Sequence, residues 1–388
     1  MQLMETTGIR EAFHNVRKHS EYICGPLETE DYVPQPIAFV SPPKWHLAHS
    51  TWFFETFILK PNVQGYRVYD PDFNYLFNSY YNNVGERTLR TDRGNVTRPT
   101  TTAVYAYRKY VDEQMDTLLE ELTDPEILAL VELGLHHEQQ HQELLITDIK
   151  YILGHNPLFP VYREGQNMVN ARNTETGFLT IPEGIYDIGH HGEGFCFDNE
   201  LGRHKVFLHE FEIAKGLVTN GGYIEFMEAG GYQDFNLWLD EGWSWVNENH
   251  ISAPMYWHLI DGVWHYFTLN GLQKVDPEAI LSHISFFEAA AFAQWKGMRL
   301  PTEFEWEIAS ANLDWGQRWE WTNSAYLPYP GFSKAPGAVG EYNGKFMINQ
   351  MVLRGASVAT SPGHARKTYR NFFHAHERWQ YTGIRLAR

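Results

Sequence analysis

Residues 124–154 read DPEILALVELGLHHEQQHQELLITDIKYILG and form the longest helical pattern in the chain. The pair Asp124-Pro125 is typical of a helix start, because aspartate caps free N–H groups and proline fits the first turn. Gly154 is a typical end. Apolar residues recur at helical spacing between these points, which predicts one inward-facing stripe. That stripe contains Leu130, Leu133, His137, His141, Leu144 and Asp148.

Two histidines of this stripe lie four residues apart, in the run HEQQHQE at 137–143. Residues at this spacing share one helix face, so the imidazoles of His137 and His141 can converge on one metal ion. Imidazoles at core positions are costly unless they are hydrogen-bonded or bound to metal. Two half-exposed histidines on an ordinary helix are equally compatible with the spacing alone.

A third metal ligand has to come from another helix. The best candidate is His49, in HLAHSTW at 46–52, and His46 lies one turn earlier as the alternative. Glu143 is a possible acceptor that fixes an imidazole tautomer, or else a solvated glutamate. Three neutral imidazoles suit zinc, iron, copper and nickel, so ligand type leaves the metal open.

Further helical patterns cover 5–22, 45–60 and 101–123. Together with the segment at 124–153 they predict an antiparallel four-helix bundle. The stretch 61–100 is rich in Asn, Tyr, Arg and Gly, and a loop of that length inside a compact domain is usually functional.

The second half of the chain has a different composition, with frequent Gly, Pro and Trp. Short apolar runs, FLTIPEGIYDIG at 178–189 and KVFLHEFEIA at 205–214, predict strands, and helical patches lie near 219–229 and 285–297. This pattern predicts an α+β domain with irregular loops. The expected organisation is a helical bundle at 1–158, a connector at 159–178 and an α+β domain at 179–388.

Composition narrows the classes of partner. The chain has 388 residues, which favours two domains, and 31 basic against 48 acidic residues give a net charge of −17. That charge argues against nucleic acid or an anionic membrane as partner. Cys24 and Cys196 are too few for a disulfide framework or a cysteine-based zinc site. The first residues lack a signal peptide's apolar core, and no run of about 18 apolar residues occurs, so we expect a cytoplasmic protein.

At these residues the chain resembles the ergothioneine sulfoxide synthase family. His49 in a Trp-rich helix, followed by a helix with the HxxxHxE pattern, is similar to the iron site of that family's DinB-like domain. The second half is similar to the family's formylglycine-generating-enzyme-like domain, which is related to C-type lectins. The stretches that carry this likeness are IPEG at 181–184, FDNE at 197–200, GGY at 230–232, WSW at 243–245, RLPTEFEW at 299–306, WEWT at 319–322, LRGAS at 353–357, YRNFF at 369–373 and GIRLA at 383–387.

One departure from true formylglycine-generating enzymes limits the chemistry. Those enzymes need paired catalytic cysteines near the C-terminal end, and no cysteine follows Cys196 here. The second domain is therefore not expected to carry out copper-thiolate oxidation.

The resemblance implies a metal, substrates and a reaction. His49, His137 and His141 would hold Fe(II). Hercynine, which is trimethylated histidine, and cysteine would react with O₂ to give hercynylcysteine sulfoxide in ergothioneine biosynthesis. Gln140 would help to seat hercynine, and Asn371 and Phe372 match positions that contact its betaine group.

Tyr80 and Tyr81 match the branch of the family that carries a tyrosine pair in this loop, the branch expected to use free cysteine. A phenol near the iron can supply a proton or hydrogen atom and steer the reaction away from simple thiol dioxygenation. Packing at the seam between domains is the alternative role. Tyr326 and Tyr329 are the next candidates for the proton donor.

Three arginines follow the tyrosine pair: Arg87, Arg90 and Arg93. Arginine is the natural bidentate partner of a carboxylate, so they predict a site for the carboxylate of the thiol substrate. A solvated loop is the expected role of at least one. Relatives that use γ-glutamylcysteine have an Asp where this chain has Phe373, which again favours cysteine.

Three other functions stay open. A relative that uses a selenosugar in place of cysteine has nothing in these residues against it. A zinc-dependent thiol transferase of the DinB type would use the same histidines, although the second domain and the tyrosine pair argue against it. A lectin-like binding module without activity would leave the three histidines unexplained.

Overall fold

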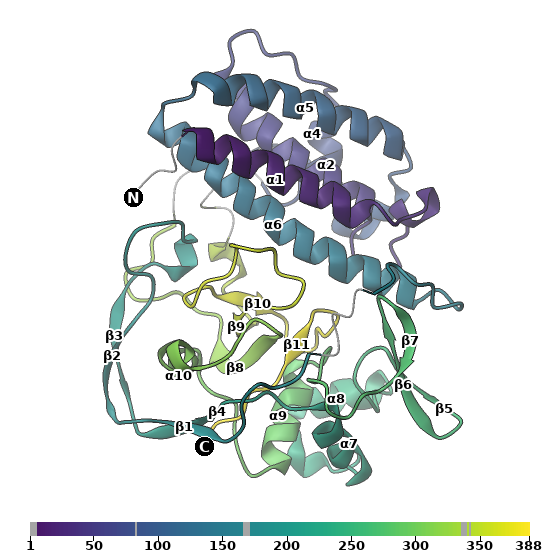
Figure 1. Ribbon diagram of the computed structural model, residues 1–388, viewed down its shortest axis with the longest axis vertical. Coiled ribbons are helices and arrows are strands. Elements are labelled where there is room, and N and C mark those ends of the chain that lie inside the picture. Colours follow the sequence, from purple (N-terminus) through teal and green to yellow (C-terminus); the bar gives the residue numbers. More distant parts are fainter. Residues whose placement is uncertain (1–5, 82–83, 166–170, 335–339, 341–342) are drawn as a thin grey trace. The chain divides into compact units, whose positions relative to one another are not determined.

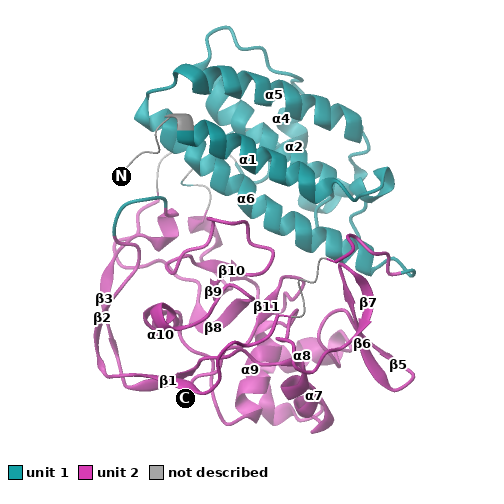
Figure 2. Ribbon diagram, in the orientation of Figure 1, with its two compact units in different colours: residues 1–158, 192–195, 335–342 teal, residues 159–191, 196–334, 343–388 magenta. Residues whose placement is uncertain are grey.

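The computed structural model describes all residues except 1–5, 82–83, 166–170, 335–339 and 341–342. The chain forms two compact units (Figures 1 and 2). The first comprises residues 1–158, 192–195 and 335–342, and the second comprises 159–191, 196–334 and 343–388. Part of the predicted connector, 166–170, lies outside the described residues. Over the described part of the chain, we find no helix with the length and apolar character that a bilayer crossing requires.

The first unit is a helical bundle, as the sequence predicts. Its long helices are α1 Thr6–Cys24, α2 Pro43–Phe54, α5 Thr101–Glu121 and α6 Pro125–Gly154. Helix α1 packs against α5 and α6, and α2 packs against the same two helices. Helix α2 continues through a π-helical segment, Glu55–Leu59, into α3 Lys60–Asn62, and the loop at 61–100 contains α4 Phe73–Phe77 and a 3-10 helix, Arg90–Asn95.

Side-chain caps explain where the two longest helices begin. The carboxylate of Asp124 accepts hydrogen bonds from the backbone N–H groups of Glu126 and Ile127 at 2.8 and 3.4 Å, and Pro125 opens α6. The hydroxyl of Thr100 accepts from the N–H of Ala103 in the same way, at 3.2 Å. These bonds satisfy N–H groups that have no partner within the helix.

Burial on α6 is wider than the predicted stripe. Leu130 and Leu144 are only half-buried, whereas Val131, Leu135 and Leu145, which lie beside the stripe, are buried. The predicted stripe is narrower than the buried face of α6, because both α1 and α2 pack against this helix. Helix α2 shows the same effect more strongly, since all 12 of its residues are buried.

The second unit contains short strands in several small sheets. The predicted apolar runs each form two strands: β1 Phe178–Ile181 and β2 Gly184–Ile188, then β3 His204–Leu208 and β4 Phe211–Ala214. Strand β1 pairs antiparallel with β4, and β2 pairs antiparallel with β3. A four-stranded sheet has the order β10-β9-β8-β11, and a three-stranded sheet has the order β5-β6-β7. The remaining strands are β5 Trp257–Ile260, β6 Val263–Thr268, β7 Gly271–Lys274, β8 Trp319–Ala325, β9 Met351–Gly355, β10 Asn371–Phe373 and β11 Thr382–Gly383.

Four helices accompany these sheets. Helices α7 Asn220–Glu228 and α9 Phe286–Trp295 confirm the two predicted helical patches, whereas α8 Asp240–Glu248 and α10 Glu303–Ala309 were missed. Helix α10 has a capping box, in which Thr302 and Glu305 each accept from the other's backbone N–H. That pattern is visible in the sequence and signals a helix start. The predicted two-domain α+β fold class is therefore confirmed.

Candidate metal centre

Three histidines from two helices converge inside the bundle. His49 lies on α2, and His137 and His141 lie on α6. One ring nitrogen from each lies within 4.8 Å of the others. The side chains are 0%, 0% and 7% exposed respectively. The alternative interpretation, two half-exposed histidines on an ordinary helix, is therefore wrong. The geometry suits a shared metal ion.

The orientation of His49 is set by a backbone carbonyl. Its Nδ1 lies 2.6 Å from the carbonyl oxygen of Phe77. A carbonyl only accepts, so Nδ1 carries the proton and the lone pair is on Nε2. Nε2 is buried and has no hydrogen-bond partner among the described residues. A buried acceptor without a donor is costly, and a bound cation would satisfy it.

Aromatic rings hold the His49 imidazole on both faces. Trp45 stacks on it with a centroid distance of 4.5 Å and an interplanar angle of 12°, and Trp52 stacks at 5.5 Å and 17°. The guanidinium of Arg93 lies over the Trp45 ring, 3.3 Å from its centroid. Residues at i−4 and i+3 flank a helical side chain, so the spacing of the two tryptophans places them there.

His46, the alternative third ligand, has both ring nitrogens in hydrogen bonds with protein groups. Its Nδ1 lies 2.9 Å from Nδ1 of His141, and its Nε2 lies 3.0 Å from Oδ2 of Asp148. His46 thus contacts a member of the histidine cluster instead of belonging to it.

The three clustered histidines are neutral at neutral pH. Burial lowers the pKa of His137 to about 3, although Glu138 raises it. Burial, followed by the charge of neighbouring imidazoles, holds the pKa of His49 and of His141 well below the usual value. Metal ions bind the neutral form of imidazole. The donor set therefore fits a divalent transition metal without any proton having to leave.

Comparison with known proteins finds two domain families along the chain. Residues 12–145 match the DinB superfamily, and residues 164–318 match the sulfatase-modifying factor enzyme 1-like domain. The N-terminal part of the chain is thus DinB-like, and the part that follows is similar to sulfatase-modifying factor enzyme 1. We refer to these as the DinB domain and the C-terminal domain.

Curated relatives match either most of the chain or a shorter part of it. The chain is 28% identical to hercynine oxygenase from Mycolicibacterium smegmatis, over 90% of this chain and 91% of the relative. It is 27% identical to hercynine oxygenase from Mycobacterium tuberculosis, over 68% and 72%. Formylglycine-generating enzyme from Streptomyces coelicolor is 31% identical over 37% of this chain and 50% of that enzyme. These relatives confirm the resemblance that the motifs indicate.

Tyr81 is part of the aromatic core of the DinB domain. It is 0% exposed, and its ring centroid lies 5.5 Å from that of Trp52 and 5.1 Å from that of Phe57. Trp52 in turn stacks on His49. One ring therefore separates Tyr81 from the histidine cluster, whereas Tyr80 is only half-buried beside it.

The three predicted carboxylate-binding arginines have different environments. Arg93 is buried, and its guanidinium donates to Ser41 Oγ at 2.8 Å and to Ser79 Oγ at 3.0 Å. Within the described chain its side-chain partners are these two hydroxyls and the Trp45 ring, with no carboxylate, and burial lowers its pKa to about 9. Arg90 is exposed and donates to the carbonyl of Phe39, while Arg87 is half-buried.

The remaining predicted substrate residues lie in different domains. Gln140 is half-buried on α6, directly before His141. Asn371, Phe372 and Phe373 form β10 of the C-terminal domain. The Phe372 ring stacks on that of Tyr326 at 4.1 Å and 11°, and Phe373 packs edge-on against Trp379.

Tyr326 and Tyr329, the next candidates for the proton donor, are buried in the C-terminal domain. The Tyr326 hydroxyl accepts from the side-chain amide of Asn199 at 2.9 Å, and the Tyr329 hydroxyl donates to Glu303 at 3.0 Å. Burial raises the pKa of both phenols above the usual value. Within that domain both hydroxyl groups already have protein partners.

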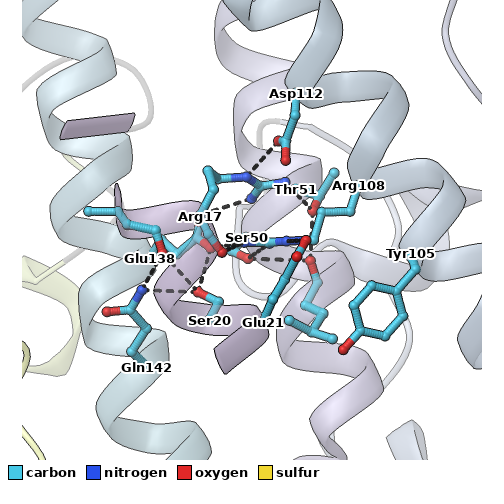
Figure 3. Close-up of polar contacts among 12 residues, drawn as sticks. Arg17, Ser20, Glu21, Ser50, Thr51, Tyr105, Arg108, Asp112, Glu138 and Gln142 are labelled. Atoms are coloured by element: carbon cyan, nitrogen blue, oxygen red, sulfur yellow. Dashed lines mark hydrogen bonds and ion pairs between the residues drawn. The ribbon is translucent and has the colours of Figure 1, made fainter. Parts of the chain in front are cut away.

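A buried polar network, which the sequence did not reveal, surrounds Glu138 (Figure 3). The Glu138 carboxylate accepts from Arg17 at 2.8 Å and from Arg108 and Ser20 at 2.6 Å. These partners come from α1 and α5, so the network links three helices of the DinB domain. The sequence offered one signal for it, a glutamate beside the inward stripe.

Proposed function

We propose that this protein is a non-haem iron(II), O₂-dependent sulfoxide synthase that joins cysteine to the imidazole of hercynine. The observation that carries the proposal is the combination of the buried, neutral cluster of His49, His137 and His141 with similarity to a hercynine oxygenase along nine-tenths of the chain. Neither would suffice alone, since three imidazoles also suit zinc.

The reaction balances without another reductant. Hercynine loses the hydrogen of one imidazole C–H bond, and cysteine loses its thiol proton as the C–S bond forms. One oxygen atom of O₂ ends on sulfur as the sulfoxide, and the other leaves as water with the two hydrogens. The four electrons that O₂ takes up come from the two substrates.

Iron(II), when bound by the three histidines, would supply redox chemistry with O₂ and open positions for substrate atoms. The protein's own contribution is to hold the ligands rigidly and to keep out water. The carbonyl of Phe77 and the rings of Trp45 and Trp52 hold the His49 imidazole in one orientation. Burial of the whole of α2 excludes solvent on that side.

Tyr81 is the better candidate of the two loop tyrosines for the proton donor. A tyrosine hydroxyl is protonated at neutral pH, so it can hold a proton until the reaction needs it. Its burial against Trp52 favours a fixed position near the histidines. In this role the phenol of Tyr81 would give up the proton and later be reprotonated from the thiol or from C–H.

The carboxylate of the thiol substrate requires a cation. Arg93 supports this role, because it is buried beside Trp45 without a carboxylate partner in the described part of the chain. A buried guanidinium without an anion is costly, and a substrate carboxylate would offset that cost. Arg87 and Arg90 of the same loop remain proposed as additional contacts.

The test is a product assay with defined metal. The full chain is purified without oxygen, loaded with Fe(II), and mixed with hercynine, cysteine and O₂, and the sulfoxide is sought by mass. Zn(II)-loaded protein and a mixture without hercynine are the controls. Sulfoxide from the iron-loaded protein alone supports the proposal. Hercynine left unused by fully iron-loaded protein would overturn it, and thiol transfer by zinc-loaded protein would point to the DinB-type transferase.

A further inference from the structure

A chain of hydrogen bonds leads from a carboxylate to the histidine cluster. Asp148 Oδ2 accepts the backbone N–H of Ser41 at 2.8 Å and lies 3.0 Å from His46 Nε2. The other nitrogen of His46, Nδ1, lies 2.9 Å from Nδ1 of His141. Asp148 and His46 are 2% and 3% exposed, so water does not compete for these bonds.

The partners determine where each proton lies. A carboxylate oxygen only accepts, so His46 Nε2 must donate to Asp148. With its one proton on Nε2, the neutral His46 ring has its lone pair on Nδ1, the nitrogen that lies beside His141. Nδ1 of His141 must then donate to it, which leaves the His141 lone pair on Nε2. If His46 Nδ1 donated to His141 Nδ1 instead, the proton of His141 would lie on Nε2, and that nitrogen could not bind a metal ion.

We propose that Asp148 and His46 are positioning residues that hold His141 in the tautomer able to bind metal through Nε2. Metal-binding histidines commonly donate their second nitrogen to a carboxylate or a carbonyl. Here a second imidazole stands between the carboxylate and the ligand, so Asp148 acts on the cluster through His46. This inference deepens the proposed function and rests on it only for the identity of the metal.

Three substitutions separate the parts of this chain. His46→Phe keeps a ring but removes the acceptor for His141. Asp148→Leu removes the acceptor for His46. Asp148→Asn is the conservative variant: the N–H of Ser41 requires an oxygen at that place, so the amide oxygen still accepts from His46. Ser50→Ala is the matched control, because Ser50 is equally buried on α2 and its hydroxyl bonds to the Leu47 carbonyl and to Arg108 instead of to His46 or Asp148.

The first measurement reads the tautomer directly. Imidazole ¹⁵N shifts of the metal-free full chain, assigned with His141→Ala, should show a protonated Nδ1 on His141 in wild type, Asp148→Asn and Ser50→Ala. In His46→Phe and Asp148→Leu the Nε2-protonated form should appear. An unchanged His141 spectrum in folded His46→Phe would overturn the inference.

The second measurement is metal affinity by anaerobic chelator competition, with Fe(II) and with Co(II), whose absorption spectrum reports the ligand geometry. His46→Phe and Asp148→Leu should weaken binding about 10–100-fold, whereas Asp148→Asn should stay within a few-fold of wild type. Full affinity and an unchanged Co(II) spectrum in His46→Phe would also refute the inference. If the tautomer changes as expected but wild type forms no sulfoxide, the positioning role stands and the proposed function fails.

Discussion

At the scale of single residues, each histidine of the cluster is oriented by a different neighbour. A backbone carbonyl fixes His49, a second imidazole fixes His141, and the Phe53 ring packs against His137 with centroids 4.7 Å apart. None of these neighbours carries a charge at the point of contact. Three neutral imidazoles held in this way are arranged before any ion binds, which lowers the cost of ordering them.

The first prediction concerns the cluster itself. Replacing His49, His137 or His141 by Ala should abolish stoichiometric iron binding, because two imidazoles hold Fe(II) far more weakly than three. The protein should stay folded, since each change removes a polar group from the core. The measurement is bound iron per chain after anaerobic loading and desalting.

The control for this prediction is His136→Ala. His136 precedes His137 on the same helix but is outside the cluster. It should retain full iron. Full iron occupancy in His137→Ala would show that the cluster is not the metal site.

The second prediction concerns the tyrosine pair. Tyr81→Phe should shift the product from sulfoxide towards cysteine sulfinic acid with hercynine left unused, because the ring stays and only the proton donor is lost. Tyr80→Phe should have a smaller effect, since Tyr80 is less buried. The ratio of the two products is measured by mass spectrometry.

Tyr107→Phe provides the comparison for this pair. Its hydroxyl is also buried, but it donates to Glu55 at 2.6 Å and lies outside the cluster. It should keep the wild-type product ratio. If Tyr80→Phe, Tyr81→Phe and the double variant also kept it, Tyr326 or Tyr329 would be the donor to test next.

At the scale of elements, helix α6 serves two functions on adjacent residues. His137 faces the cluster, and Glu138, the next residue, binds Arg17 of α1 and Arg108 of α5. The same helix therefore supplies two candidate ligands and the carboxylate that ties the bundle together (Figure 3). Removing that carboxylate would leave two buried guanidinium groups with fewer partners.

The third prediction is that Glu138→Gln destabilises the DinB domain by about 3–5 kcal/mol, the usual cost of breaking a buried ion pair from one side. Amide exchange of peptides from α1 and α6, followed by mass spectrometry, isolates this domain from the other. Glu113→Gln is the control, because Glu113 is exposed and its ion pair with Lys109 is worth under about 1 kcal/mol. Equal exchange rates in the two variants would contradict the prediction.

The fourth prediction is the pH dependence of the same contact. Burial alone would raise the pKa of Glu138, but Arg108 and Arg17 overcome it and lower the pKa to about 2. An unfolded glutamate has a pKa of about 4.3, so the unfolded chain takes up the proton first as pH falls. The stability that Glu138 contributes is therefore complete above about pH 4.3 and is lost towards pH 2.

This acid dependence should be smaller in Glu138→Gln, by at most about 1.4 kcal/mol per pH unit over that range. Exchange of the α6 amides at pH 6, 4 and 3, corrected for intrinsic exchange rates, provides the comparison. Identical pH dependence in wild type and variant would show that Glu138 is not ionised in the folded protein.

At the scale of the whole molecule, the residues proposed to bind metal and substrates are divided between the two domains. The DinB domain holds the histidines, the tyrosine pair and the three arginines, and the C-terminal domain holds β10 with Asn371, Phe372 and Phe373. If β10 contacts substrate, a change there should alter specificity without altering metal binding.

The fifth prediction is that cysteine has a higher kcat/KM than γ-glutamylcysteine. The larger thiol carries its one ammonium group on the glutamyl part, together with a second carboxylate, and the Phe373 side chain cannot pair with that ammonium. Phe373→Asp should reduce the ratio of kcat/KM for cysteine to that for γ-glutamylcysteine, because it supplies a carboxylate. Phe373→Leu should leave this ratio unchanged. A higher kcat/KM for γ-glutamylcysteine in wild type would refute the assignment of cysteine as the thiol. The three proteins are compared at equal iron content.

Features that depend on neighbours along the chain could be predicted from the sequence. The start of α6 follows from Asp124 and Pro125, and the shared face of His137 and His141 follows from four residues of helical spacing. Strands β1 to β4 follow from the apolar runs at 178–189 and 205–214, whereas their pairing joins one run to the other and has no local signal. Short helices such as α10 were missed because seven residues, about two turns, show little periodicity, although the capping box of α10 was present.

Which of the two histidines on α2 belongs to the cluster could not be predicted from local sequence and depends on the tertiary structure. His46 and His49 are three residues apart, so they project from α2 only about 60° apart, and both can face α6. The rotation of α2 about its own axis is set by side chains packing between helices, which no local pattern specifies. The same holds for Arg93: its polar loop predicts exposure, and only the distant rings of α2 and the hydroxyls of Ser41 and Ser79 make its burial stable.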